Sequence, residues 1–173
     1  MKKVFLISFL VLAADQALKF WVKTHMYLGE KIPVTSWFDL HFVENPGMAF
    51  GMEFGGEAGK LLLTLFRIVV SVLLLWLIRN LTRRHASATL VIPLTLIFAG
   101  AVGNITDSMF YGLVFNDPAV GVATFLPEGG GYAPLLHGKV VDMFYFHFWQ
   151  GDLPQWLPIW GGEPFVFFPA VFN

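Results

Sequence analysis

Several ionisable and amide side chains lie inside apolar stretches of the chain, where they could move protons. The clearest is Asp142, within the run Val140-Val141-Asp142-Met143-Phe144. A carboxyl group in such surroundings loses hydration, so its pKa should rise above the ordinary range, as suits a general acid or base. A lone buried Asp is also a common structural residue. Taken alone, Asp142 leaves both interpretations open.

Two further pairs of polar residues have helical spacing. Asp15 and Lys19 are four residues apart, and Asn104 and Asp107 are three apart, so each pair lies on one face of a helix. Each pair has a structural interpretation, as a neutralised ion pair or a hydrogen-bond node, and a functional one, as the lining of a polar site. Small residues that permit close helix contact precede the second pair: Gly100, Ala101 and Gly103.

Other chemistries are excluded or disfavoured by composition. The chain has no cysteine, which excludes disulfides, thiolate nucleophiles and cysteine-based metal sites. Its five histidines have no ligand spacing, so no metal site is expected. No serine-nucleophile, P-loop or dinucleotide motif is visible. A net charge of -1 argues against a nucleic-acid partner.

The elements that must position these residues are strongly apolar. Hydrophobic residues make up 56% of the 173 residues and charged residues 13%, and the mean hydropathy is +0.65. A soluble domain carries roughly 25% charged residues. This excess of apolar side chains is too large for one soluble core, so lipid must cover part of it. The sequence therefore predicts an integral membrane protein.

Three stretches have the length of a membrane-spanning helix, at about 4–23, 61–79 and 88–111. About 20 helical residues cross the ~30 Å hydrocarbon core. The first stretch follows Lys2 and Lys3, as in a signal peptide, but it is too long for one and lacks a small-residue cleavage site. We predict an all-α membrane bundle formed by one domain, 1–173, together with a small β-rich segment.

The distribution of basic residues predicts the orientation. Lys2, Lys3 and the Arg79–Arg84 loop should face the cytoplasm, so 25–59 and 113–168 should face the other side. Within 25–59, the alternation of Phe38–Phe42 predicts a strand, and Asn45-Pro46-Gly47 predicts a turn. Arg67, early in the second helix, should reach the membrane surface or pair with an Asp.

Five short stretches, taken in order, resemble motifs of the lipoprotein signal peptidases (signal peptidase II), which are bacterial membrane aspartyl proteases. The resemblance spans nearly the whole chain. The stretches are Asp15-Gln16-Ala17-Leu18-Lys19, Asn45-Pro46-Gly47-Met48-Ala49-Phe50-Gly51, Gly103-Asn104-Ile105-Thr106-Asp107, His137-Gly138-Lys139-Val140-Val141-Asp142 and Phe168-Pro169-Ala170-Val171-Phe172-Asn173.

The resemblance implies an aspartic endopeptidase of the bacterial cytoplasmic membrane, with its active site near the outer face. Its substrates would be prolipoproteins that carry a diacylglyceryl group, and its surroundings membrane lipids. It would need no cofactor, and a monomer is expected. Two close aspartates share one proton, so one can activate water while the other protonates the scissile amide.

The resemblance also assigns roles to single residues. Asp142 would be one of the two catalytic carboxylates. Substrate binding or support of the dyad would fall to Asn45, Gly47, Asn104 and Asn173, and a structural polar role to Asp15, Lys19 and Asp107.

The chain departs from the family pattern at three places. Ser108 stands where the family usually has Arg, so whatever that Arg stabilises must be supplied otherwise. Residues 113–136 look like an insertion. The family's last motif reads Phe-Asn-x-Ala-Asp, and this sequence stops at Asn173. We therefore expect the second catalytic Asp and a fourth membrane helix beyond Asn173, and the 173 residues alone to be catalytically incomplete.

Two alternatives remain at this stage. One is a non-enzymatic polytopic membrane protein, such as a small transporter subunit, in which Asp15, Asp107 and Asp142 pair with Lys19 and Arg67. Transporters more often show repeated halves or broken helices, and neither is visible. The other is a dyad of Asp107 with Asp142, which would need nothing beyond Asn173.

Overall fold

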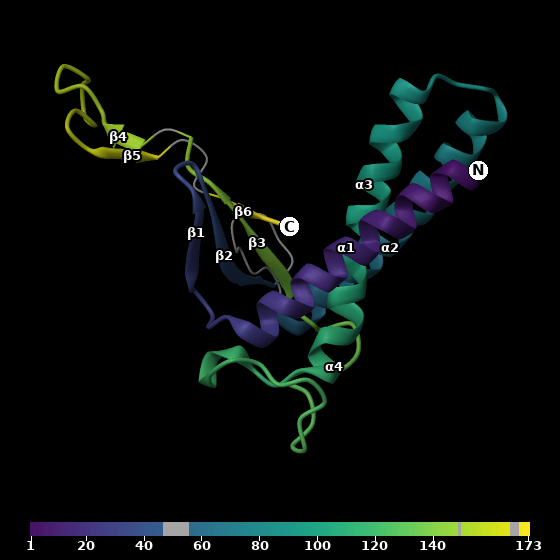
Figure 1. Cartoon of the computed structure of the whole chain (residues 1–173), viewed down its shortest axis with the longest axis horizontal. Helices are drawn as coiled ribbons and strands as arrows, with labels where there is room; N and C mark the ends of the chain where they lie inside the picture. Colours follow the sequence, from purple (N-terminus) through teal and green to yellow (C-terminus); the bar gives the residue numbers. More distant parts are fainter. Residues whose placement is uncertain (47–55, 149, 167–169) are drawn as a thin grey trace.

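The computed structural model describes residues 1–46, 56–148, 150–166 and 170–173 (Figure 1). Three predicted features lie wholly or partly outside these ranges: the turn at 45–47 with the candidate site residue Gly47, the rest of that motif up to Gly51, and residues 168–169 of the last motif.

Within the described residues, three helices are long and apolar enough to cross a membrane. They are α1 (Lys2–His25), α2 (Gly56–Arg83) and α3 (Ala88–Thr106). The three predicted helices are thereby confirmed, and α1 and α2 extend past the predicted ends because their terminal residues continue the helical hydrogen bonding into polar sequence. Large apolar side chains such as Leu6, Leu62 and Val72 are exposed on their outer faces, as lipid contact requires.

The chain leaves α3 through a change of helix type rather than a loop. Residues Asp107–Tyr111 form a π-helical turn (η2), followed by the short α4 (Gly112–Val114). A π turn inserts an extra residue per turn and is frequent at functional sites. Here the turn begins at Asp107, one of the polar residues that the sequence singles out.

A four-stranded antiparallel sheet lies beside the end of the bundle where α1 ends (Figure 1). Its order is β1 (Lys31–Thr35), β2 (Phe38–Asn45), β3 (Val140–Phe146) and β6 (Val171–Phe172). The predicted strand at 38–42 is confirmed within β2. A second, two-stranded sheet pairs β4 (Gln150–Asp152) with β5 (Pro164–Val166).

The register between β2 and β3 determines which residues lie next to Asp142, the candidate catalytic residue in β3. Leu40 is opposite Phe144, whereas Val43 is opposite Asp142, so β2 has one extra residue between these positions. Such a bulge bends a strand and redirects its side chains, and bulges are common beside active sites. Beyond the bulge, Asn45 is opposite Val140 and reaches the same end of the sheet as Asp142.

One apolar cluster joins the sheet to the helices. It combines the last turns of α1 (Val22, Met26), the inner face of the sheet (Phe42, Val141, Met143) and the residues after α3 (Tyr111, Phe115, Ala123). All of these side chains are buried. Because three segments that are distant in sequence share this core, the sheet is held at a fixed place against the helix ends.

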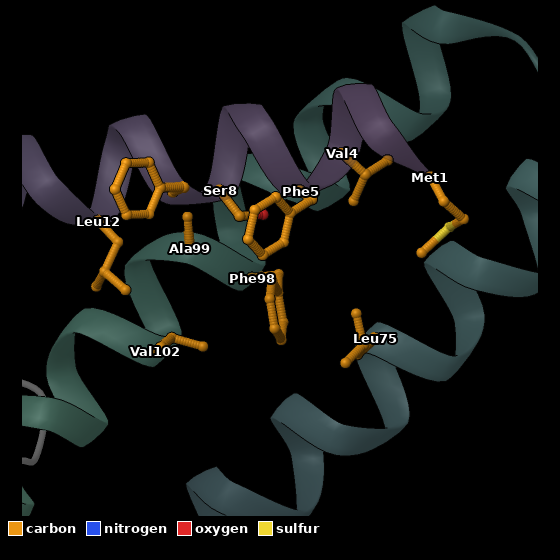
Figure 2. Close-up of a pocket in the computed structure, with 10 residues that line it drawn as sticks. Met1, Val4, Phe5, Ser8, Leu12, Leu75, Phe98, Ala99 and Val102 are labelled. Carbon is orange, nitrogen blue, oxygen red and sulfur yellow. The ribbon is translucent and has the colours of Figure 1, made fainter.

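An apolar cleft of ≈ 330 Å³ opens between α1, α2 and α3, in the half of the bundle near Met1 (Figure 2). Figure 2 shows Phe5, Leu75, Phe98 and Val102 facing this space, and Ser8 is the one polar residue in its lining. Hydrocarbon suits such a lining, whether from lipid or from another helix. The candidate site lies elsewhere, toward the opposite ends of α1 and α3.

Candidate active site

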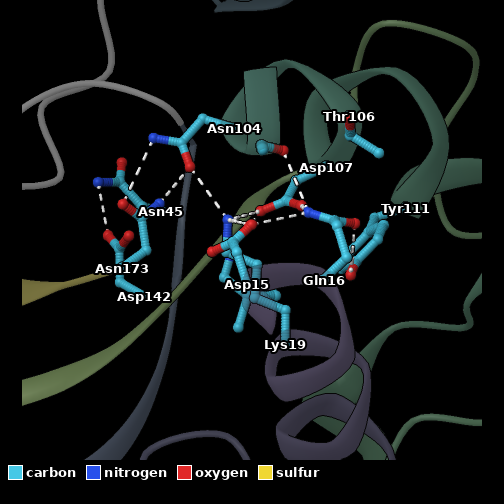
Figure 3. A network of polar contacts seen from close by, with 12 residues as sticks. Asp15, Gln16, Lys19, Asn45, Asn104, Thr106, Asp107, Tyr111, Asp142 and Asn173 are labelled. Carbon is cyan, nitrogen blue, oxygen red and sulfur yellow. Dashed lines mark hydrogen bonds and ion pairs between the residues drawn. The ribbon is translucent and has the colours of Figure 1, made fainter. Parts of the chain in front are cut away.

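A polar network joins α1, α3 and the sheet where these elements meet (Figure 3). Its centre is Asp107, which is fully buried. One carboxylate oxygen, Oδ1, accepts a hydrogen bond from Gln16 Nε2 at 2.9 Å. The other, Oδ2, lies 2.8 Å from Lys19 Nζ and accepts from the backbone N–H of Val141 at 3.3 Å. Both oxygens of Asp107 are therefore engaged.

Lys19 is the buried cation of this network. Its Nζ lies 3.2 Å from Asp15 Oδ2, the predicted pair within α1, and donates to Asn104 Oδ1 at 3.1 Å. A charge that loses its water needs such partners. Lys19 finds them in both helices, in Asp15 of α1 and Asn104 of α3. The predicted grouping of Asp15 with Lys19 and of Asn104 with Asp107 is present, and the structure merges the two pairs into one cluster.

Close approach of α1 and α3 depends on Gly103. A Cβ on this glycine would lie 3.2 Å from Asp15 Cγ and closer still to the carboxylate oxygen Oδ2. Gln16 Nε2 also donates to the carbonyl of Gly103, at 3.3 Å. The π turn adds Tyr111, whose hydroxyl donates to Gln16 Oε1 at 3.2 Å. Small residues at this crossing therefore let the polar side chains of α1 bond directly to α3.

Asp142 lies beside this network but has different surroundings. Asp142 is 7% exposed, and its Oδ2 accepts a hydrogen bond from Asn45 Nδ2 at 2.9 Å. Burial raises the pKa of Asp142 above the ordinary value of 3.8, while the Asn45 hydrogen bond and the cations Lys19 and Arg67 act in the opposite direction. The sequence predicts this direction of shift.

The three candidate asparagines come from three elements and meet near Asp142 (Figure 3). Asn45 ends β2, Asn104 lies in α3 and Asn173 follows β6. Asn104 Oδ1 accepts from Asn173 Nδ2, and Asn104 Nδ2 donates to Asn173 Oδ1 at 3.5 Å. Amide groups can donate and accept together, so this group can support a carboxylate or hold a peptide backbone.

Arg67 contributes a positive charge near the two aspartates of the site. The side chain is half-buried in α2, and its positive charge is close enough to act on Asp142 and Asp107. Among the described residues, no three His, Asp or Glu side chains are grouped so that they could hold a metal ion.

Sequence reasoning missed a second buried ion cluster. Lys23 Nζ is ion-paired with Glu44 Oε1, and Lys139 Nζ lies 3.3 Å from Glu44 Oε2. Lys23 also lies over the rings of Phe115 and Tyr132, at 5.3 and 5.2 Å. The available signal was spacing: Lys23 follows Lys19 by one helical turn, on the same face. This cluster fixes β2, next to Asn45, to α1.

The contacts divide the buried carboxylates into two kinds. Asp107 is bonded to Lys19, Gln16 and the backbone of Val141, which suits a structural group that joins the helices to the sheet. Asp142 accepts a hydrogen bond from the neutral amide of Asn45 and has a pKa raised by burial, which suits a group that gains and loses a proton. The geometry favours Asp142 over Asp107 for acid–base chemistry.

The chain is similar over nearly its whole length to proteins of one known family. The family model for signal peptidase (SPase) II matches residues 7–173. A lipoprotein signal peptidase of Porphyromonas gingivalis is 52% identical over 165 residues, which cover 95% of this chain and 72% of the relative. One of Amoebophilus asiaticus is 36% identical over 173 residues, covering 96% of this chain and 68% of the relative.

Solved structures show a similar fold. Two structures titled as a bacterial membrane enzyme, solved by the in meso method at 2.3 and 1.9 Å resolution, have TM-scores of 0.57 and 0.56. Each covers 89% of this chain, and this chain covers 76% and 80% of theirs. At 22% identity this similarity supports the fold alone.

Proposed function

The chain belongs to the signal peptidase II family, and on this premise we propose which residues cleave its lipoprotein substrates and how. It is a membrane aspartic signal peptidase for lipoproteins. Asp142 is one of its two catalytic carboxylates. The observation that carries this assignment is the contrast between Asp142, which is buried and accepts from the neutral amide of Asn45, and Asp107, whose two oxygens are bonded to Lys19, Gln16 and Val141.

The two carboxylates divide acid and base roles between them. Close aspartates cannot both ionise at low cost, so they share a proton. The ionised one takes a proton from water as the water attacks the scissile carbonyl carbon. The other gives its proton to the leaving nitrogen as the tetrahedral intermediate collapses. Asn45, which already bonds Asp142, keeps that carboxylate in place.

The second carboxylate is contributed by residues that follow Asn173. In the β3–β6 ladder, Phe144 is opposite Phe172 and Tyr145 is opposite Val171. By the same register, Asn173 is level with Met143, and the next residue would be level with Asp142. A chain that continues from Asn173 thus starts beside the candidate catalytic carboxylate. Dyad formation between Asp107 and Asp142 is the weaker alternative, because Asp107 is already neutralised by Lys19.

The substrate side of the proposal follows from the location of the site. The network lies where α1 ends and the sheet begins, at one end of the membrane-spanning bundle. A prolipoprotein with a diacylglyceryl group is held in lipid by its acyl chains. Its cleavage site therefore lies near the membrane surface, at the same depth as the polar network. Asn104, Asn173 and Gly47 hold its backbone, in a monomeric enzyme of the bacterial cytoplasmic membrane. The N-terminus lies in the cytoplasm and the site near the outer face.

Substitution of Asp142 tests the proposal. In the product of the complete gene, Asp142→Asn keeps the shape of the side chain and removes its proton chemistry. We expect cleavage of a diacylglyceryl-modified prolipoprotein to fall by at least about 10²–10⁴-fold, with unchanged membrane levels. Asp107→Asn is the matched control and should retain cleavage per folded molecule. Robust cleavage by the Asp142 variant would overturn the assignment.

A length comparison tests the source of the second carboxylate. A polypeptide that ends at Asn173 is compared with the product of the complete gene at matched membrane levels, on the same substrate. We expect the shorter polypeptide to be inactive, because one carboxylate cannot fill the acid and base roles together. Equal turnover would instead favour the pairing of Asp107 with Asp142.

A further inference from the structure

The β4–β5 hairpin exposes a cluster of large apolar side chains at its tip. Trp156, Ile159 and Trp160 are 80%, 89% and 61% exposed. The ten residues from Leu153 to Gly162 include no charged side chain, and Asp152 and Glu163 stand at the base. Two tryptophans and an isoleucine on so small a tip are costly to leave in water.

The backbone of the tip is closed on itself, so this exposure is a property of a folded turn. Leu157 N–H donates to the Pro154 carbonyl, Gly161 N–H to Leu157 and Gly162 N–H to Leu153. A Cβ on Gly161 would lie 2.6 Å from the Gln155 carbonyl oxygen. With its backbone groups bonded inward, the turn directs its large side chains outward.

The hairpin projects to the side of the helical bundle rather than along the helix axes (Figure 1). It leaves from the sheet, which lies beside the end of the bundle where α1 ends. That end carries its own exposed aromatic residues, Phe20 and Trp21 in α1. Tryptophans at helix ends typically lie at the membrane–water interface. An arm that extends sideways from this level runs along the membrane surface.

A row of aromatic rings connects the sheet with the arm. Trp37 stacks on Phe146 and Phe148, with centroids 6.2 and 5.6 Å apart, and Phe38 stacks on Phe146 at 5.0 Å. Phe148 is 62% exposed and lies two residues before β4. Exposed aromatic rings are therefore present at the start of the arm as well as at its tip.

We propose that the tip of the β4–β5 hairpin inserts into the membrane interface, at the surface reached by the end of α1, with Trp156, Ile159 and Trp160 as its anchors. The partner is the lipid of the same membrane that the helices span. An uncharged, tryptophan-rich tip matches the interfacial region, where aromatic rings are half in hydrocarbon and half hydrated.

The anchor would give the catalytic strand a second attachment to the bilayer. β3, which carries Asp142, leads through His147 and Phe148 into the hairpin. One end of the sheet is fixed to the helices by the buried cluster, and the other end would be fixed to lipid by the tip. The contacts with the helices and the insertion of the tip into lipid would together set the height of the sheet above the membrane. This inference does not depend on which residues catalyse.

Site-directed spin labelling tests the proposal. Because the chain has no cysteine, a single cysteine can be introduced at Ile159 and labelled with a nitroxide. The control is Glu128→Cys, an exposed position in the segment that follows α4. The protein is reconstituted in vesicles of phosphatidylethanolamine and phosphatidylglycerol. Collision rates of the label are measured with oxygen, which enters lipid, and with a neutral nickel chelate, which stays in water.

We expect the ratio of the oxygen collision rate to the nickel collision rate to be several-fold higher at Ile159 than at the control position Glu128. Nickel access equal to the control would place the tip in water and overturn the proposal. Protection from both reagents would also overturn it, since the tip would then be covered by protein. If the label at Ile159 disturbs the turn, Gln155→Cys provides a second position with the same expectation.

A variant of the anchors gives an independent measurement. Trp156→Ser combined with Trp160→Ser removes the two rings, and the backbone hydrogen bonds that close the turn do not depend on these side chains. With the label at Gln155, the double variant should raise nickel access to the level of Glu128, while the label at Glu128 itself is unaffected. A label depth that does not change in the double variant would show that these tryptophans are not the anchor.

Discussion

Asp107 of the π turn accepts a hydrogen bond from the backbone N–H of Val141, the residue directly before Asp142. A buried carboxylate of the helical bundle thus holds the strand that carries the candidate catalytic acid. Because Asp107 is paired with Lys19 at the same time, the position of β3 depends on an ion pair between α1 and α3. Asp107 therefore holds the residue directly before the candidate catalytic aspartate.

Asp107→Asn should lower stability more than it lowers intrinsic activity. The change leaves the buried Lys19 with Asp15 as its remaining anion, and breaking such a pair costs about 3–5 kcal/mol. Thermal unfolding in detergent micelles measures the loss. Asp15→Asn is the matched control: it also contacts Lys19 but is partly exposed, so its loss should be smaller. Abolished cleavage at an unchanged Tm would instead indicate a catalytic role for Asp107.

Gly103→Ala should destabilise the contact between α1 and α3. The new methyl group would collide with the Asp15 carboxylate, and overpacking of this kind costs about 1–3 kcal/mol. Gly100→Ala is the control on the same helix, since its Cβ would meet no other part of the protein within 4 Å. Tm values in the same detergent should therefore fall for Gly103→Ala and hold or rise for Gly100→Ala. Equal effects would contradict the close contact.

The raised pKa of Asp142 makes its contribution to stability depend on pH. The folded state holds the proton more tightly than the unfolded state, whose Asp titrates near 3.8. Stability from this group is therefore full below that value and is lost as pH rises through the folded-state pKa. Asp142→Asn has no such loss, so the Tm of this variant should rise relative to the Tm of the unsubstituted protein as pH increases from about 4 through the folded-state pKa of Asp142. A difference that shrinks with rising pH would contradict this sign.

Labelling of introduced cysteines tests the proposed orientation. Thr82 lies near the end of α2, and Glu128 lies in the segment after α4. With N-terminus and α2–α3 loop in the cytoplasm, an impermeant maleimide should label Glu128→Cys in cells with a permeabilised outer membrane. Thr82→Cys should react only after lysis of the inner membrane. The reverse pattern would invert the topology.

The helices and the strand within β2 could be predicted because their signals are local. A run of about 20 apolar residues is long enough for the bilayer, whatever the rest of the chain does. The grouping of Asp15 with Lys19 was likewise visible, because a spacing of four residues fixes neighbours on a helix. A pairing of Asp107 with Lys19 was considered only in the non-enzymatic alternative, because the two residues belong to segments that are distant in sequence.

The other features of the fold and the site depend on contacts between segments that are distant in sequence. The register of β2 against β3, with its bulge before Val43, sets where Asn45 meets Asp142 and has no local signature. The pairing of Lys23 with Glu44 was missed for the same reason. The π turn at Asp107 reflects a shift of backbone hydrogen bonds that residue preferences do not encode. The sequence therefore indicated candidate residues, whereas their arrangement came from the structure.

The ion pair within α1 also has a consequence for the order of assembly. During synthesis α1 reaches the membrane before α3 has left the ribosome, so its lysine enters without Asp107. Each charge at the centre of an inserting helix costs about 2.5–3.5 kcal/mol on insertion scales. Asp15, one turn away, already lies 3.2 Å from Lys19 and can accompany it through the translocon as a neutral pair. The carboxylate of Asp107 then joins a cation that its own helix has already brought into lipid.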